Sequence, residues 1–191
     1  MHGRGASEHD LTPLADLLDP EKRLVALSPR GPLALPPGGS HWYIVREIGY
    51  PDPPTFLATF EQASSWLDAA LEEAGVEPER AVLAGFSQGA VMSYSLGLAA
   101  GRPRPVAILA MSGFIPTVDG FELDLESRAG LPVSISHGTY DPVIGVEWGH
   151  DARDRLRAAG ADVAYREDPV AHQITPAGLA QARTVLEKAL P

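Results

Sequence analysis

The chain has 191 residues, a formal net charge of −10 and no cysteine. Its length and its 45% hydrophobic residues predict one domain over residues 1–191 with a sizeable core. The acidic charge disfavours nucleic acid and anionic membrane surfaces as partners, because phosphates are bound by clustered Lys and Arg. Without cysteine there are no disulfides, thiolate nucleophiles or Cys-ligated metals. We find no apolar run long enough for stable membrane insertion and no secretion signal, so we expect a cytoplasmic protein.

The N-terminal segment is predicted to form a glycine-rich loop followed by a short helix. The stretch His2-Gly3-Arg4-Gly5 precedes residues 10–18, where leucines recur at helical spacing. A glycine loop before a helix can present backbone N–H groups to an anion, and the Arg4 N–H is our candidate donor. The alternative is a flexible terminus. We expect His2 to brace this loop, and residues 24–27 to form a short buried strand.

A long segment rich in proline and glycine covers residues 28–55. It has no steady period, yet it carries large apolar side chains such as Trp42, Tyr43 and Ile44. Long irregular loops in compact domains are usually functional or disordered, and disordered linkers seldom hold so many apolar groups. We expect these side chains, with Phe114 from a second irregular segment, to contact a substrate in an apolar pocket. In the alternative, Trp42 and Tyr43 only cover the core.

The rest of the chain alternates predicted helices and strands. Thr55 is expected to cap a helix that ends at Gly75, and Thr175 to cap the last helix. The other predicted segments are strands at residues 80–84, 106–111, 132–136 and 162–166 and helices at residues 88–99 and 145–159. This alternation is typical of a mainly parallel sheet with helices on both faces.

The junction after the strand at residues 80–84 carries the strongest chemical signal. Its sequence, Gly85-Phe86-Ser87-Gln88-Gly89, matches G-x-S-x-G, in which small residues let a strained turn project the serine hydroxyl. The Gln88 N–H begins the next helix, where it could hold a developing oxyanion. The alternative is a strand-to-helix turn that merely contains glycine.

A serine nucleophile needs a general base and a carboxylate that orients the base. Asp141 and His172 each follow a predicted strand, as Ser87 does, and ligands bind beyond the carboxyl ends of parallel strands. The order Ser, Asp, His is the order found in α/β-hydrolases. Asp168 is the rival carboxylate. We expect His137 to tie the turn around Asp141 together by hydrogen bonding.

Neither a zinc-binding motif nor a phosphate-binding glycine loop is present, so the sequence predicts no metal site and no phosphate-binding loop of that kind. Four spaced motifs together resemble the phospholipase/carboxylesterase family, which includes bacterial carboxylesterases and acyl-protein thioesterases: His2-Gly3-Arg4-Gly5, Gly85-Phe86-Ser87-Gln88-Gly89-Ala90, His137-Gly138-Thr139-Tyr140-Asp141-Pro142-Val143 and Ala171-His172-Gln173-Ile174. The resemblance covers essentially the whole chain and implies an α/β-hydrolase fold and cofactor-free hydrolysis of carboxylic esters or thioesters. It also implies particular roles: nucleophile Ser87, triad acid Asp141, base His172, and an oxyanion hole of the Arg4 and Gln88 backbone N–H groups.

Two features depart from the family pattern. Family members commonly have glycine before the catalytic histidine, where this chain has Ala171, a small residue from which we expect little effect. In the family the His-Gly-x-Gly loop also follows a central strand, whereas here only Met1 precedes His2. We therefore expect the N-terminal strands to be absent or truncated. The chain could begin downstream of its natural start, neighbouring strands could close the gap, or a second copy could supply a strand in a homodimer.

From the sequence we expect a serine hydrolase that cleaves short- to medium-chain carboxylic esters, small-molecule substrates, through an acyl-enzyme. The same chemistry would serve an acyl thioesterase or a lysophospholipase. The alternative of another class is a non-catalytic, hydrolase-like binding protein.

Overall fold

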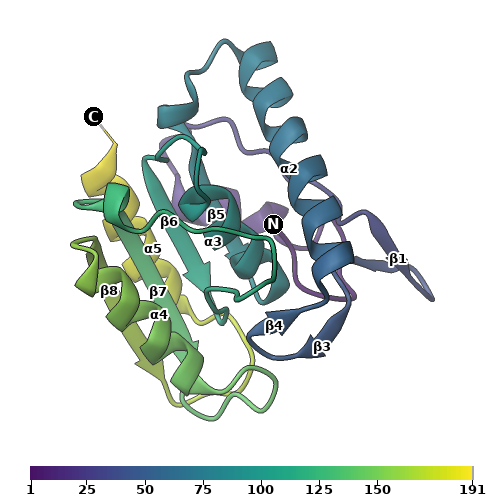
Figure 1. Ribbon diagram of the computed structural model, residues 1–191. Coiled ribbons are helices and arrows are strands. Elements are labelled where there is room, and N and C mark those ends of the chain that lie inside the picture. Colours follow the sequence, from purple (N-terminus) through teal and green to yellow (C-terminus); the bar gives the residue numbers. More distant parts are fainter. Residues whose placement is uncertain (191) are drawn as a thin grey trace.

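The computed structural model describes residues 1–190, and a parallel sheet forms its centre (Figure 1). The strands lie side by side in the order β5 (Val82–Phe86), β6 (Ala107–Met111), β7 (Pro132–Gly138) and β8 (Asp162–Asp168). Each neighbouring pair is parallel. Every residue of β6 is buried, which explains why its sequence is a continuous apolar run rather than an alternating one.

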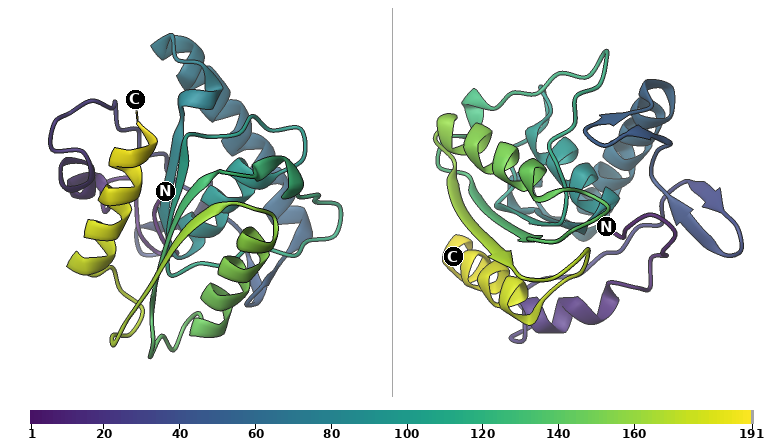
Figure 2. Two further views of the ribbon diagram at one scale, coloured as in Figure 1. Left: turned by 90° about the vertical axis from the view of Figure 1, so that its left-hand side faces the viewer. Right: turned by 90° about the horizontal axis from the view of Figure 1, so that it is seen from below.

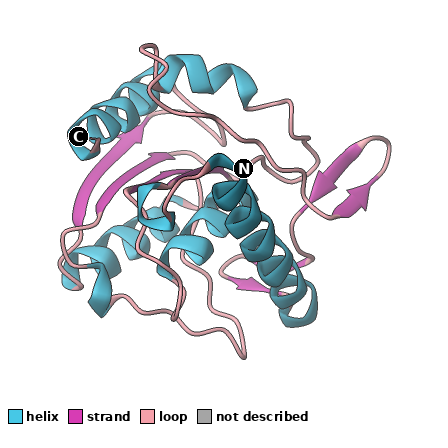
Figure 3. Cartoon of the chain, turned by 90° about the horizontal axis from the view of Figure 1, so that it is seen from above, coloured by secondary structure: helices cyan, strands magenta, loops and turns pink. Residues whose placement is uncertain are grey.

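Helices cover both faces of this sheet (Figures 2 and 3). One face is covered by α3 (Gln88–Leu98) and α4 (Val146–Ala158), and the other by α1 (Thr12–Leu18) and α5 (Pro176–Ala189). The helix α2 (Pro53–Ala74) packs against α3. The predicted mainly parallel sheet with helices on both faces is therefore confirmed. In the described part of the chain, no helix is long and apolar enough to cross a membrane.

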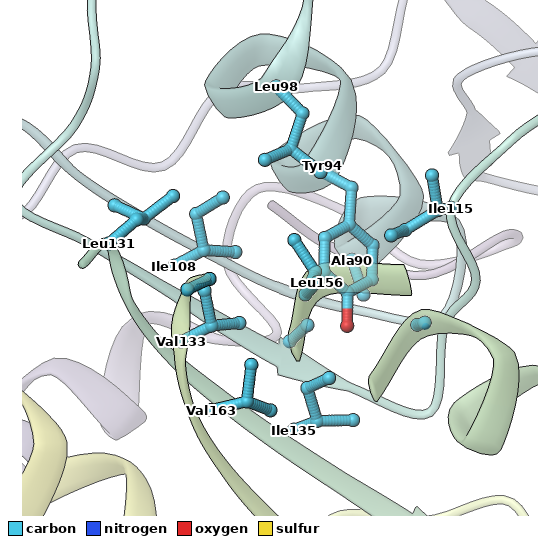
Figure 4. Packing of buried hydrophobic residues seen from close by; sticks show 13 residues of the cluster. Ala90, Tyr94, Leu98, Ile108, Ile115, Leu131, Val133, Ile135, Leu156 and Val163 are labelled. Carbon is cyan, nitrogen blue, oxygen red and sulfur yellow. The ribbon is translucent and has the colours of Figure 1, made fainter. Parts of the chain in front are cut away.

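The largest part of the core lies between the sheet and the helices α3 and α4 (Figure 4). Its members include buried side chains from each layer: Tyr94 and Leu98 of α3, Ile108 of β6, Val133 and Ile135 of β7, and Leu156 of α4. Apolar side chains at alternate positions of β6 and β7 thus pack against the apolar faces of α3 and α4. This packing fixes the carboxyl ends of the strands, where the polar loops begin.

The start of α2 differs from the prediction. Asp52, not Thr55, is the N-cap, and its carboxylate accepts hydrogen bonds from the Thr55 N–H at 3.2 Å and the Thr55 hydroxyl at 2.9 Å. Pro53 can occupy the first helical position because its missing N–H would have no partner there, so the helix starts earlier than expected. The predicted end at Gly75 (φ 64°) and the Thr175 cap of α5 are confirmed.

The strand predicted at residues 24–27 is not formed. Val25 is 80% exposed and Leu27 is 51% exposed, in a segment without regular structure. Among residues 1–190 no backbone pairs with these residues, and apolar composition alone cannot hold a strand without a ladder of hydrogen bonds.

Met1 instead lies beside β5. Its amino nitrogen donates to the Ala84 carbonyl at 2.7 Å, and its carbonyl accepts from the Phe86 N–H at 3.2 Å. Alternate contacts of this kind are those of a parallel strand pair. Met1 is thus the residue that pairs with β5 on the side away from β6. That a second copy supplies a strand there stays a prediction.

The segment at residues 28–55 contains two small antiparallel hairpins rather than an irregular loop alone. These hairpins pair β1 (Leu33–Leu35) with β2 (Gly39–His41) and β3 (Val45–Glu47) with β4 (Tyr50–Pro51). Strands of two or three residues are too short to leave a recognisable period in the sequence. The first hairpin also pairs with the N-terminal loop, because the Gly5 N–H donates to the Ser40 carbonyl at 2.8 Å.

Candidate active site

Ser87 occupies a strained turn between β5 and α3. Its backbone angles, φ 57° and ψ −123°, lie in a region that residues other than glycine rarely adopt. The flanking glycines allow the close backbone contacts of the turn, since a Cβ on Gly85 would lie 2.2 Å from the Gly89 carbonyl. The Ser87 N–H donates to the Met111 carbonyl at 2.9 Å, which ties the turn to β6.

The N-terminal glycine loop packs against this turn. A Cβ on Gly3 would lie 3.3 Å from the Ser87 Cβ, which is a tight contact, so the loop backbone lies close to the serine. The buried His2 ring contacts the Gly3 carbonyl through Nδ1 at 2.8 Å, and its Nε2 accepts from the Gly31 N–H at 2.9 Å. This pattern assigns the neutral tautomer with the proton on Nδ1, and burial lowers the pKa of His2. The prediction that His2 braces the loop is confirmed.

The Gly3 carbonyl also sets the direction of the next N–H. In a trans peptide the C=O and the N–H point in opposite directions. Because the Gly3 carbonyl accepts from His2 and from the Ala6 N–H at 3.3 Å, the Arg4 N–H points away from His2. Arg4 and Ser87 line the same cavity. The loop can therefore offer a backbone donor near the serine.

Asp141 and His172 meet at the carboxyl ends of β7 and β8. The His172 Nδ1 lies 2.6 Å from the Asp141 Oδ2. The other carboxylate oxygen, Oδ1, accepts from the N–H groups of Val143 and Ile144, both at 2.9 Å. The Asp141 side chain has no exposed surface, and the His172 ring packs on the Phe86 ring with centroids 4.7 Å apart. With Nδ1 bound to the carboxylate, Nε2 is the ring nitrogen left to act as a base.

His137 supports the turn that carries Asp141. Its Nε2 donates to the Ile144 carbonyl at 2.8 Å and lies 3.6 Å from the Asp141 Oδ2. Burial lowers the pKa of His137, which keeps the ring neutral. The prediction that His137 ties this turn together by hydrogen bonding is confirmed.

The rival carboxylate, Asp168, has other partners. It accepts from the Arg166 Nε at 2.8 Å and from the Thr175 hydroxyl at 2.5 Å. The hydrogen bond from Arg166 is the main reason why the pKa of Asp168 is lowered. Asp168 thus joins the end of β8 to the cap of α5, whereas Asp141 contacts the His172 ring.

Gly138 lets the acid loop and the histidine loop touch. A Cβ there would lie 2.1 Å from the Ala171 carbonyl oxygen and 2.5 Å from the Val170 carbonyl oxygen. Gly138→Ala should therefore separate Asp141 from His172 and lower the rate of any reaction that uses this pair about 10- to 100-fold. Gly38→Ala is the matched control, because nothing lies within 4 Å of a Cβ at Gly38. Equal activity of the two variants, both folded by circular dichroism, would contradict this prediction.

A cavity of about 410 Å³ opens beside Ser87 and His172. Its other walls combine apolar and charged side chains: Ala6, Leu11, Phe86 and Ile174 with Arg4 and Asp10. Sequence reasoning missed Leu11 and Ile174 as lining residues, although each lies close in sequence to a loop that it had singled out. Within residues 1–190, His, Asp and Glu side chains nowhere form a group of three that could hold a metal ion.

The structure places the four residues expected to contact substrate elsewhere. Trp42, Tyr43 and Phe114 are at most 3% exposed and belong to the core cluster beside α2 and α3. Ile44 is 48% exposed. None of these four residues lines the cavity beside Ser87. This placement favours the alternative in which Trp42 and Tyr43 cover the core.

Known proteins resemble this chain along its whole length. Solved structures with the same fold include the carboxylesterase of Bacillus cereus, which is 26% identical with a TM-score of 0.85 over 100% of this chain and 86% of that chain. The carboxylesterase of Mesorhizobium loti is 24% identical with a TM-score of 0.83, over 98% of this chain and 86% of that one, and shows the likeness of fold.

Sequence relatives carry hydrolase names. A Bacillus subtilis (strain 168) protein named as hydrolase MhqD is 29% identical over 100% of this chain and 92% of its own length. The acyl-protein thioesterase 1 of Gibberella zeae is 32% identical over 62% of this chain, which is about half (52%) of that protein. The model of the phospholipase/carboxylesterase family matches residues 1–190 of this chain. The chain therefore belongs to the phospholipase/carboxylesterase family of α/β-hydrolases and is an enzyme of the serine-hydrolase type.

Proposed function

We propose that this enzyme hydrolyses short- to medium-chain carboxylic esters through an acyl-enzyme on Ser87. One observation carries the proposal: the strained Ser87 and the His172 ring line one cavity, and His172 is bound to Asp141 at 2.6 Å. A serine beside a base that a carboxylate orients is the arrangement that activates a hydroxyl for attack on a carbonyl.

Each group has one task in the reaction. The Ser87 Oγ attacks the ester carbonyl while the His172 Nε2 takes its proton, and Asp141 stabilises the imidazolium that forms. The Arg4 and Gln88 N–H groups donate to the oxyanion of the tetrahedral intermediate. His172 then gives its proton to the leaving alcohol. Water attacks the acyl-enzyme with His172 as base, which releases the acid and restores Ser87.

The cavity supports a substrate of modest size. Its volume of about 410 Å³ is at the small end for ligand sites, and Leu11, Phe86 and Ile174 give it apolar walls. A short or medium acyl chain can remove water from these side chains, which stabilises binding by about 0.8 kcal/mol for each buried CH₂. The acyl group is thus favoured up to the length at which the cavity is full.

A substrate panel tests the proposal. We expect p-nitrophenyl esters of short and medium acyl chains to be hydrolysed faster than long ones and faster than lysophosphatidylcholine. An acyl thioester of matched length distinguishes the thioesterase activity that the name of one relative suggests. Preference for the thioester would overturn the ester assignment, and inactivity on all substrates, with Ser87→Ala as the blank, would overturn hydrolysis.

A further inference from the structure

We propose that Trp42 and the Gln88 side chain are positioning residues that hold the two oxyanion donors at a fixed separation. The inference rests on the proposed function, because it takes the Arg4 and Gln88 N–H groups as the donors. One donor lies on the N-terminal loop and the other at the start of α3, so their spacing depends on what joins these two segments.

The Gln88 side chain binds the backbone of a third segment at two points. Its Oε1 accepts from the Trp42 N–H at 3.0 Å, and its Nε2 donates to the Tyr43 carbonyl at 3.0 Å. Gln88 is only 4% exposed and lies at an apolar core, where an amide without partners would be costly. These two hydrogen bonds fix Trp42 relative to the start of α3.

Trp42 in turn contacts the N-terminal loop. Its indole Nε1 donates to the His2 carbonyl at 2.8 Å, and its ring lies 5.3 Å from the His2 ring. The loop backbone is close to α3 at this point, since a Cβ on Gly89 would lie 2.7 Å from the His2 carbonyl oxygen. The indole hydrogen bond therefore fixes the residue directly before the Gly3–Arg4 peptide.

The contacts form a continuous path from one donor to the other. From the Gln88 backbone the path runs through the Gln88 side chain, Trp42 and His2 to the Gly3 carbonyl, which belongs to the same peptide unit as the Arg4 N–H. Oxyanion donors act only when both lie about 2.7–3.1 Å from the position of the oxyanion. A break in the path should weaken transition-state binding more than substrate binding, so kcat should fall while KM changes little.

Trp42→Phe is the first test, because it removes the indole N–H and keeps an aromatic ring. We expect kcat for a p-nitrophenyl ester to fall about 10- to 100-fold, which is less than the loss of a whole oxyanion donor. KM should stay within about twofold, and the Ki of a boronic acid transition-state analogue should rise in the same ratio as kcat falls.

Thr59→Val is the matched control. The Thr59 hydroxyl donates to the Trp42 carbonyl at 2.5 Å, so this variant loses another hydrogen bond of the same residue outside the path. Thermal unfolding of both variants measures the loss of stability. An equal fall of kcat in Thr59→Val and Trp42→Phe would overturn the positioning role, because loosening of the segment would then explain both.

Gln88→Met supplies an independent variant that keeps the backbone N–H and loses both side-chain hydrogen bonds. If Gln88 acts through Trp42, the double variant should be about as slow as the slower single variant, whereas multiplied effects would overturn the path. Turnover by the wild type with unchanged kcat in Trp42→Phe would overturn the positioning role alone. Absence of turnover by the folded wild type would overturn the proposed function and, with it, this inference.

Discussion

Treatment with a fluorophosphonate should add the mass of one adduct to the wild-type protein and nothing to Ser87→Ala. Ser87, in its strained turn, lines the cavity that His172 also lines, so His172 is the base expected to take the hydroxyl proton. Ester hydrolysis by Ser87→Ala should fall by more than about 10⁴-fold, because the nucleophile is lost while the oxyanion donors remain.

Two further variants make the labelling result specific. His172→Ala should label much more slowly than the wild type, since the hydroxyl loses its base. Ser93→Ala should label like the wild type, because Ser93 is buried within α3 and its hydroxyl donates to the Gly89 carbonyl. An adduct on Ser87→Ala would place the nucleophile elsewhere. A folded wild type that gains no adduct would favour the non-catalytic binding protein.

Sequence reasoning located the sheet and the polar loops because their signals are local. The continuous apolar run of β6 and the glycines around Ser87 reflect constraints on neighbouring residues. Asp141 and His172 are 31 residues apart, yet each follows a strand, so their meeting at 2.6 Å follows from the parallel order of the sheet.

The wrong or unsupported expectations depend on partners that are distant in sequence. Residues 24–27 have the composition of a strand, but strand formation also requires a pairing edge. Trp42 and Tyr43 have the composition of an acyl pocket, but the Trp42 indole donates to the His2 carbonyl, 40 residues away, and the ring is buried. The local sequence does not indicate whether a large aromatic side chain points toward a cavity or toward the core. The cap of α2 is a smaller case, because Asp52 and Thr55 are both good capping residues.

Asp141→Asn should lower kcat about 10⁴-fold while the protein stays folded. The amide oxygen of the new side chain is held by the Val143 and Ile144 N–H groups that now bind Oδ1. Its NH₂ group then takes the place of Oδ2 and faces His172 Nδ1. Two donors cannot share a hydrogen bond, so the imidazole proton moves to Nε2. With Nε2 protonated, His172 cannot accept the proton of Ser87, and labelling should slow in the same ratio as kcat.

Asp168→Asn is the matched control, since it makes the same chemical change in the rival carboxylate. It weakens the hydrogen bonds with Arg166 and Thr175, so the melting temperature should fall while kcat stays within about threefold of the wild type. The reverse pattern, with Asp168→Asn inactive and Asp141→Asn active, would assign the acid role to Asp168. Of these two carboxylates, Asp141 contacts His172, so a fall in kcat identifies the carboxylate that orients the base. Loss of the contacts that Asp168 makes beside α5 should lower stability only.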